Sequence, residues 1–233
     1  MRGILCCRPA AASPSSGPIL SPPCSPCRGP RGVPPARSLS VVTGVESEVS
    51  QESPAKAVVR RRLILLRHAE SSWSDRSLRD HDRPLSKAGR SDAITVSRKL
   101  QQMGWIPELI LSSDATRTKE TLHLMREHAA CFLEAKVRYV PSFYSVAAMD
   151  GQTAEHLQKA VCEYSEDEIL TVMCMGHNKG WEEAASMLAG ASIELKTCNA
   201  ALLEASGQSW NEAFASAGLG GWKLHGIVKP ESV

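Results

Sequence analysis

The sequence has no run of apolar residues long enough to cross a membrane. Such a span needs about 20 predominantly apolar residues, whereas the densest short run here is Leu63 to Leu66. Aromatic residues are also scarce, at 5% of the chain, although 42% of the 233 residues are hydrophobic. This length and composition suit one domain with a substantial core and argue against a second full domain.

Acidic residues are missing from the first 45 positions, and the first carboxylate in the chain is that of Glu46. The segment holds nine Pro, seven Ser and five Arg, without Lys and without helical or strand periodicity. Such a composition cannot bury enough apolar surface to offset the entropy of ordering it. Subtracting the five arginine charges from the net charge of +2 leaves −3 for residues 46–233. The body of the chain therefore gives no reason to expect a nucleic-acid partner.

An N-terminus that is rich in Arg and Ser and lacks acids is typical of an organelle transit peptide. The apolar stretch of a secretory signal does not follow the first arginines, and the high Pro content favours a chloroplast over a mitochondrion. We therefore expect a disordered transit peptide over residues 1–45, a linker over 46–60 and a folded domain over 61–230. The alternative is an ordinary disordered tail.

Several sequence motifs of metal and nucleotide binding are also absent. Cys24 and Cys27 have the spacing of half a metal site, but no second half follows. The four cysteines after residue 61 stand among apolar neighbours and are expected to be core thiols. The chain has neither a Gly-x-Ser-x-Gly elbow nor a phosphate-binding loop of the Gly-x4-Gly-Lys type. We expect no metal and no cofactor.

Beyond residue 61, strand-like and helix-like patterns alternate. Apolar runs predict strands over 61–67, 109–112, 137–140 and 169–175, and edge strands over 200–205 and 222–228. Amphipathic patterns predict helices over 86–103, 114–127, 153–163 and 181–190, with Ser86 and Asp114 as N-caps. This order predicts a three-layer α/β/α fold, a mostly parallel sheet with helices on both faces.

Sheets of this kind bind ligands at the carboxyl ends of their strands. Arg67-His68 ends the first strand, Arg117 lies in the first turn of the helix after Ser112-Ser113, and His177 follows the strand over 169–175. We expect these two arginines and two histidines to meet on one rim. Because the guanidinium fork matches phosphoryl oxygens in geometry and charge, the expected ligand is a dianion.

A histidine in such a site can attack phosphorus in line and become phosphohistidine. This covalent step divides one difficult hydrolysis into two easier ones. The flanking cations would stabilise the charge on the equatorial oxygens of the transferred group.

Four sequence blocks, in order between about residues 61 and 190, extend this pattern. They are Leu65 to Trp73 (LLRHAESSW), Arg83 to Ser86 (RPLS) with Gly89, Ser112 to Thr118 (SSDATRT) with Thr121, and Met175 to Asn178 (MGHN). In content and spacing they resemble the histidine phosphatase superfamily, also called phosphoglycerate mutase-like. The short chain most resembles its small phosphohistidine phosphatase branch.

The resemblance implies a role for each block. His68 would be the nucleophile, Arg67 and Arg117 would grip the phosphoryl group, and His177 would donate to a phosphoryl oxygen. Ser74 stands where mutases of this superfamily usually carry Asn, and it is a further candidate for substrate binding.

No Glu marks the usual general-acid position of the superfamily, and Asp150 and Glu155 are the candidates for it. A positioned proton donor is worth about 100- to 10,000-fold for a poor leaving group such as an alkoxide. A phosphorylated imidazole can be protonated before it leaves. The missing acid therefore favours P–N or other activated phosphoryl substrates.

The sequence thus predicts a metal-independent phosphatase that works through a phosphohistidine on His68. Its partner would be a phosphohistidine protein or a phosphorylated small molecule, with neither nucleic acid nor membrane as a partner. The alternatives are a phosphate-ester phosphatase or phosphoglycerate mutase-like enzyme, and a non-catalytic phosphoryl-binding regulatory module. Trp73 and Trp105 are expected to pack, and His81 is expected to face away from the cleft.

Overall fold

The computed structural model describes residues 57–149 and 151–230. The predicted transit peptide over 1–45, most of the predicted linker and the candidate acid Asp150 lie outside the described residues.

Six strands form one sheet in the order β3-β2-β4-β1-β5-β6. Their bounds are β1 Arg60–Arg67, β2 Leu109–Ser112, β3 Lys136–Tyr139, β4 Thr171–Gly176, β5 Ala200–Ser206 and β6 Lys223–Val228. The pairs β1–β4, β4–β2 and β2–β3 are parallel, whereas β5 pairs antiparallel with both β1 and β6. The prediction of a mostly parallel sheet is confirmed.

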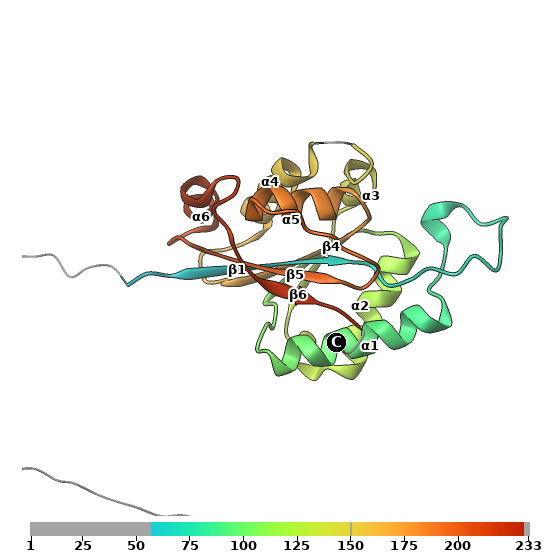
Figure 1. The fold of residues 1–233 in the computed structure, drawn as a ribbon. Helices are drawn as coiled ribbons and strands as arrows, with labels where there is room; N and C mark the ends of the chain where they lie inside the picture. Colours follow the sequence, from blue (N-terminus) through green and yellow to red (C-terminus); the bar gives the residue numbers. More distant parts are fainter. Residues whose placement is uncertain (1–56, 150, 231–233) are drawn as a thin grey trace, which may run out of the picture. The chain divides into compact units, whose positions relative to one another are not determined.

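Helices cover both faces of this sheet (Figure 1). One face carries α3 Ser142–Val146, α4 Thr153–Tyr164, α5 Gly180–Ala189 and α6 Trp210–Ala217, and the other carries α1 Lys87–Gln102 and α2 Thr116–His128. Two short 3-10 turns, η1 Asp80–Asp82 and η2 Ala130–Phe132, lie in the connections. The result is the expected three-layer α/β/α architecture.

The apolar run of β1 explains why both faces are covered. Leu63 and Leu65 belong to the core cluster beneath α4, α5 and α6, whereas Ile64 and Leu66 belong to the cluster above α1 and α2. Successive side chains of a strand point to opposite faces, so an uninterrupted apolar run supplies both cores. The side chains of all four residues are fully buried.

Some predicted elements differ from the observed ones. The segment 200–205 is not an edge strand, because β5 lies between β1 and β6. Ser86 caps α1 as expected, with its Oγ accepting from the backbone N–H of Gly89. Asp114 does not cap α2: its carboxylate contacts His81, and Ala115 takes the N-cap position. The sequence patterns also did not predict the short helices α3 and α6.

Within the ranges that the structure describes, no helix is both long and apolar enough to span a bilayer.

Candidate active site

The four side chains expected to share one rim do meet at the carboxyl edge of the sheet. Arg67 ends β1 and His68 follows it, Arg117 lies in the first turn of α2, and His177 follows β4. Arg67, His68 and Arg117 line a pocket of about 440 Å³. His177 contacts Arg117, and its ring centroid is 5.2 Å from that of His68. The adjacency of β1, β4 and β2 in the sheet brings the three segments together.

The hydrogen bonds of His68 define which ring nitrogen carries the proton. Nε2 lies 3.1 Å from Nε of Arg117, and because the guanidinium N–H can only donate, Nε2 is the acceptor. The proton is therefore on Nδ1, which donates to the backbone oxygen of Ala69 at 2.7 Å. The ring is left with an unprotonated nitrogen directed toward the cationic end of the pocket.

Burial is the main reason that His68 stays neutral. Removal from water, together with the charges of Arg117 and Arg67, lowers the pKa of His68 to about 4, although the hydrogen bond to Ala69 partly opposes this shift. At neutral pH the imidazole thus has the free electron pair that a nucleophile needs.

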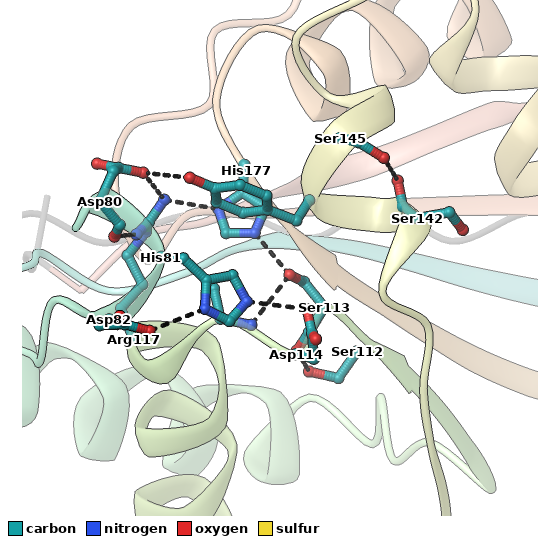
Figure 2. Close-up of polar contacts among 12 residues, drawn as sticks. Asp80, His81, Asp82, Ser112, Ser113, Asp114, Arg117, Ser142, Ser145 and His177 are labelled. Atoms are coloured by element: carbon teal, nitrogen blue, oxygen red, sulfur yellow. Dashed lines mark hydrogen bonds and ion pairs between the residues drawn. The ribbon is translucent and has the colours of Figure 1, made fainter.

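Arg117 uses all three of its guanidinium nitrogens, and Figure 2 shows its contacts with Asp80 and His177. Nε donates to His68, Nη1 donates to the backbone oxygen of Asp80 at 2.5 Å, and Nη2 contacts both the Asp80 carboxylate at 2.9 Å and His177 at 3.2 Å. The side chain is only 8% exposed. One buried cation therefore links the end of β1, the turn η1 and the end of β4.

His177 is also held as a neutral ring. Its Nδ1 accepts from Nη2 of Arg117, so the proton is on Nε2, which donates to Oγ of Ser113 at 2.7 Å. Burial, the neighbouring His68 ring and the Arg117 charge lower the pKa of His177 to about 2. In this arrangement Nδ1 is an acceptor, so the predicted donation to a phosphoryl oxygen needs a second proton on the ring.

Arg67 contributes a second cation with spare hydrogen-bonding capacity. Its Nη1 donates to the backbone oxygen of Leu195 at 2.9 Å. Its Nε is buried and has no hydrogen-bond partner among the residues that the structure describes. A buried donor without a partner is costly, and an anion in the adjacent pocket would satisfy it.

Asp80 and Tyr144 are site residues that the sequence patterns did not predict. The Asp80 carboxylate lines the pocket with His68, and its Oδ2 accepts from Arg117 and from the Tyr144 hydroxyl, both at 2.9 Å. Asp80 stands three positions before the Arg83 block, in a segment without periodicity, so its proximity to that block was the available signal.

The surroundings of the two tryptophans and of His81 were also predicted from the sequence. Trp105 is buried as predicted, but Trp73 is 65% exposed and lines the mouth of the pocket, with the Arg83 guanidinium 3.4 Å from its ring centroid. His81 is not among the residues that line the pocket, but its ring packs edge-on against Tyr144 with a centroid distance of 5.0 Å.

Two further candidates do not lie in this pocket. The Ser74 hydroxyl bonds to that of Ser72 in the exposed loop, where the chain has already left the sheet edge. Glu155 is exposed in the first turn of α4 and lines a separate cavity with Met187 and Leu219. Neither residue contacts the group around His68.

Among the described residues, no cluster of three or more His, Cys, Asp or Glu side chains has an arrangement suited to a metal ion. Cys174 and Cys198 are buried free thiols, as expected, whereas Cys131 and Cys162 are only half-buried.

Comparison with known proteins identifies a family and a similar fold. Residues 63–160 match the family model of the histidine phosphatase superfamily (branch 1). An uncharacterized chloroplastic protein of Arabidopsis thaliana is 67% identical over 180 residues, which are 77% of this chain and 82% of the relative.

Two solved structures have a similar fold. One, from Agrobacterium tumefaciens and named for the phosphohistidine phosphatase SixA, is 24% identical with a TM-score of 0.56, over 73% of this chain and 98% of that one. The other, a mycobacterial glucosyl-3-phosphoglycerate phosphatase, is 18% identical with a TM-score of 0.51, over 71% and 97%. At this identity the likeness concerns the fold alone. The family model spans the first three sequence blocks, and the chain belongs to the histidine phosphatase superfamily.

Proposed function

We propose that this protein is a phosphatase that acts through a phosphohistidine intermediate on His68, with phosphohistidine or another activated phosphoryl compound as its substrate. One observation carries the proposal: the unprotonated Nε2 of a neutral, buried His68 faces Nε of Arg117 at 3.1 Å, in a pocket that Arg67 also lines. This arrangement places a nucleophile beside two cations of the kind that bind phosphoryl groups.

In the first step, a phosphoryl group displaces the direct contact between His68 and Arg117. Nε2 of His68 attacks phosphorus as the bond to the leaving group breaks, while Nδ1–H remains on the oxygen of Ala69. Arg117 and Arg67 then bind the equatorial oxygens, where charge accumulates in the transition state.

His177 would acquire its predicted role only when substrate is bound. A phosphoryl dianion next to the ring favours the charged form and so opposes the burial that keeps His177 neutral. A proton on Nδ1 would then donate to a phosphoryl oxygen, while Nε2–H stays on Ser113.

Phosphate esters are the second candidate substrate class. The name of the mycobacterial structural neighbour is that of an ester phosphatase, but Glu155, the described candidate for the general acid, lies outside the pocket. Without a proton donor, departure of an alkoxide leaving group would be slower by about 100- to 10,000-fold. The same pocket without turnover would be a phosphoryl-binding regulatory module.

We also propose that the protein acts in the chloroplast. The acid-free N-terminal segment and the chloroplastic relative from Arabidopsis thaliana support this location. The partner there would be a phosphohistidine protein or a phosphorylated small molecule.

Turnover by the full chain tests the proposal. Wild type and His68→Ala are incubated with a phosphohistidine-bearing protein, an aryl phosphate and 3-phosphoglycerate, and phosphate release is measured. We expect turnover of the first two substrates and its loss by at least about 1,000-fold in His68→Ala, since the nucleophile is gone.

Acid-labile label trapped on His68 would establish the intermediate. Faster turnover of 3-phosphoglycerate than of the other two substrates would favour the ester phosphatase. Tight phosphate binding without turnover of any substrate would leave only the regulatory module.

A further inference from the structure

We propose that Asp80 is the catalytic base of the second half-reaction, which accepts a proton from the water that hydrolyses phosphohistidine at His68. The inference rests on the proposed function and adds to it a residue that neither the sequence pattern nor the family resemblance indicates.

Asp80 lies in the same pocket as the nucleophile. Its carboxylate lines the same pocket as His68, and it contacts Arg117, which in turn contacts Nε2 of His68. The turn η1 thus places a carboxylate next to the cation that would hold the transferred phosphoryl group. The Asp80 side chain is 53% exposed, so water can reach it and a proton accepted there can leave to solvent.

The surroundings of Asp80 keep it ionised. Its neighbours are Arg117 on α2, Tyr144 on α3 and Arg83 after η1, each of which donates a hydrogen bond or supplies positive charge. Partial burial by itself would raise the pKa of Asp80, but the Tyr144 hydrogen bond and the Arg117 charge outweigh it and lower the pKa. A carboxylate in this state is a proton acceptor at neutral pH.

The two carboxylate oxygens of Asp80 have different partners. Oδ2 accepts from both Arg117 and Tyr144, which fixes the orientation of the group. Among the described residues, the one partner of Oδ1 is Nη1 of Arg83 in a longer ion pair of 3.3 Å, which leaves lone pairs on Oδ1 for a water molecule.

The atoms and protons of the step balance. The water oxygen forms a bond to phosphorus as the bond from phosphorus to Nε2 of His68 breaks, and a water proton passes to Oδ1 of Asp80. His68 leaves as a neutral imidazole, because Nδ1 retains its proton on the oxygen of Ala69. Asp80 then releases the proton to solvent and inorganic phosphate dissociates.

The same ionised state determines which donors react in the first step. A carboxylate has no proton to give, so Asp80 cannot assist the departure of an alkoxide. The imidazole of phosphohistidine departs as a neutral ring when its other nitrogen already carries a proton, so it needs no proton from Asp80. The base of the second step therefore also makes the site selective for phosphoryl donors with good leaving groups.

Rapid-quench kinetics of the full chain separate the two steps. With a labelled phosphohistidine protein or an aryl phosphate as donor, we expect Asp80→Asn to label His68 within several-fold of the wild-type rate. Breakdown of that labelled intermediate should slow by about 100- to 10,000-fold, the range for loss of a general base. Phosphohistidine would then accumulate in the variant, and Asp80→Glu should recover part of the breakdown rate.

The matched control is Asp82→Asn, which removes a carboxylate from the same turn. Asp82 contacts Arg79 and His81 and makes no contact with Arg117 among those that the structure describes. We expect wild-type breakdown in this variant. Breakdown should also slow at low pH in the wild type as Asp80 becomes protonated, and this decline should disappear in Asp80→Asn.

Other outcomes would overturn the inference. Equal slowing of labelling and breakdown in Asp80→Asn would mean that Asp80 only positions Arg117, and unchanged breakdown would mean that it has no role. A breakdown defect in Glu70→Gln instead would assign the base to Glu70, the other carboxylate that lines the pocket. If wild type never labels His68, the proposed function itself fails, which is a different result from a labelled enzyme with unaltered breakdown.

Discussion

At the scale of single residues, Arg117 is the side chain on which the site depends most. Its planar fork reaches His68, Asp80 and His177 simultaneously. A lysine has the same charge, but its single ammonium cannot span three partners in these fixed directions. The geometry of this arginine therefore matters as much as its charge.

We expect Arg117→Lys to lower kcat/KM by about 100-fold or more, because the group would lose its paired contacts with phosphoryl oxygens in the transition state. Steady-state kinetics with an aryl phosphate measure the effect. Arg126→Lys is the control, since Arg126 lies on the same helix but contacts the backbone oxygen of Leu133, away from the pocket. Equal losses in both variants would contradict a specific role for Arg117.

The buried histidines predict how stability depends on pH. The pKa of His68 is about 4 when folded, below its ordinary value of 6.5, so the unfolded chain binds more protons between these values. The free energy of unfolding should therefore fall as the pH is lowered from about 6.5 toward 4, and His177, with a pKa of about 2, should act in the same direction.

Urea unfolding at pH 7 and pH 5 measures this dependence. His68→Gln should lose less stability between the two pH values than wild type, because it removes one group that must gain a proton. His123→Gln changes an exposed histidine on α2 and should behave like wild type. A steeper pH dependence in His68→Gln would contradict the assignment of a neutral, buried His68.

At the scale of elements, the packing of α1 against the loop after His68 requires a glycine. A Cβ on Gly89 would lie 2.2 Å from the backbone oxygen of Glu70, two residues from the nucleophile. The same oxygen accepts from the backbone N–H of Ser86, so the loop and the start of the helix are held together here. The glycine of the second sequence block is thus explained by close approach of two backbones.

Gly89→Ala should therefore be destabilising, contrary to the usual rule for helices. Helix propensity alone would stabilise the variant by about 1 kcal/mol, but relief of the clash should cost about 1–3 kcal/mol and displace Glu70. The free energy of unfolding measured in urea and the rate of aryl phosphate turnover should both decline. Ser91→Ala, at an exposed position of the same helix, is the control, and a Gly89→Ala protein as stable as that variant would contradict the argument.

At the scale of the whole molecule, strand order determines where the site lies. The three strands whose ends carry Arg67, Ser113 and His177 are neighbours in the order β2-β4-β1 and run parallel. Their carboxyl ends therefore meet at one edge, near the middle of the sheet, with α2 beginning there. The antiparallel strands β5 and β6 extend the sheet and contribute no nucleophile or arginine of the site.

Import into isolated chloroplasts tests the predicted leader. Labelled full-length chain should enter the organelle and become shorter, with its new N-terminus before the folded domain that begins near residue 61. A chain in which Arg2, Arg8, Arg28, Arg31 and Arg37 are replaced by Glu should fail to enter, because transit peptides are poor in acids. Import of that variant at the wild-type rate would leave the ordinary-tail alternative.

The sequence by itself determined the features that rest on local pattern. Continuous apolar runs predicted the buried strands, and helical periodicity predicted most of the helices in the two outer layers. The positions of the strand ends indicated His68, Arg117 and His177 as candidates for the site. The predicted strands and helices agree with the structure because burial imposes a period on the chain. The three residues lie close together because parallel strands bring their carboxyl ends together.

Only the tertiary structure decided what depends on distant contacts. Asp80 and Arg117 are 37 residues apart, and Asp80 and Tyr144 are 64 apart, in segments with no periodic signal. The protonated nitrogen of each histidine, the exposed position of Trp73 and the interior position of β5 likewise depend on neighbours supplied by other elements. A residue's partners across the fold leave no mark in its local sequence, because a loop carries no burial pattern from which they can be inferred.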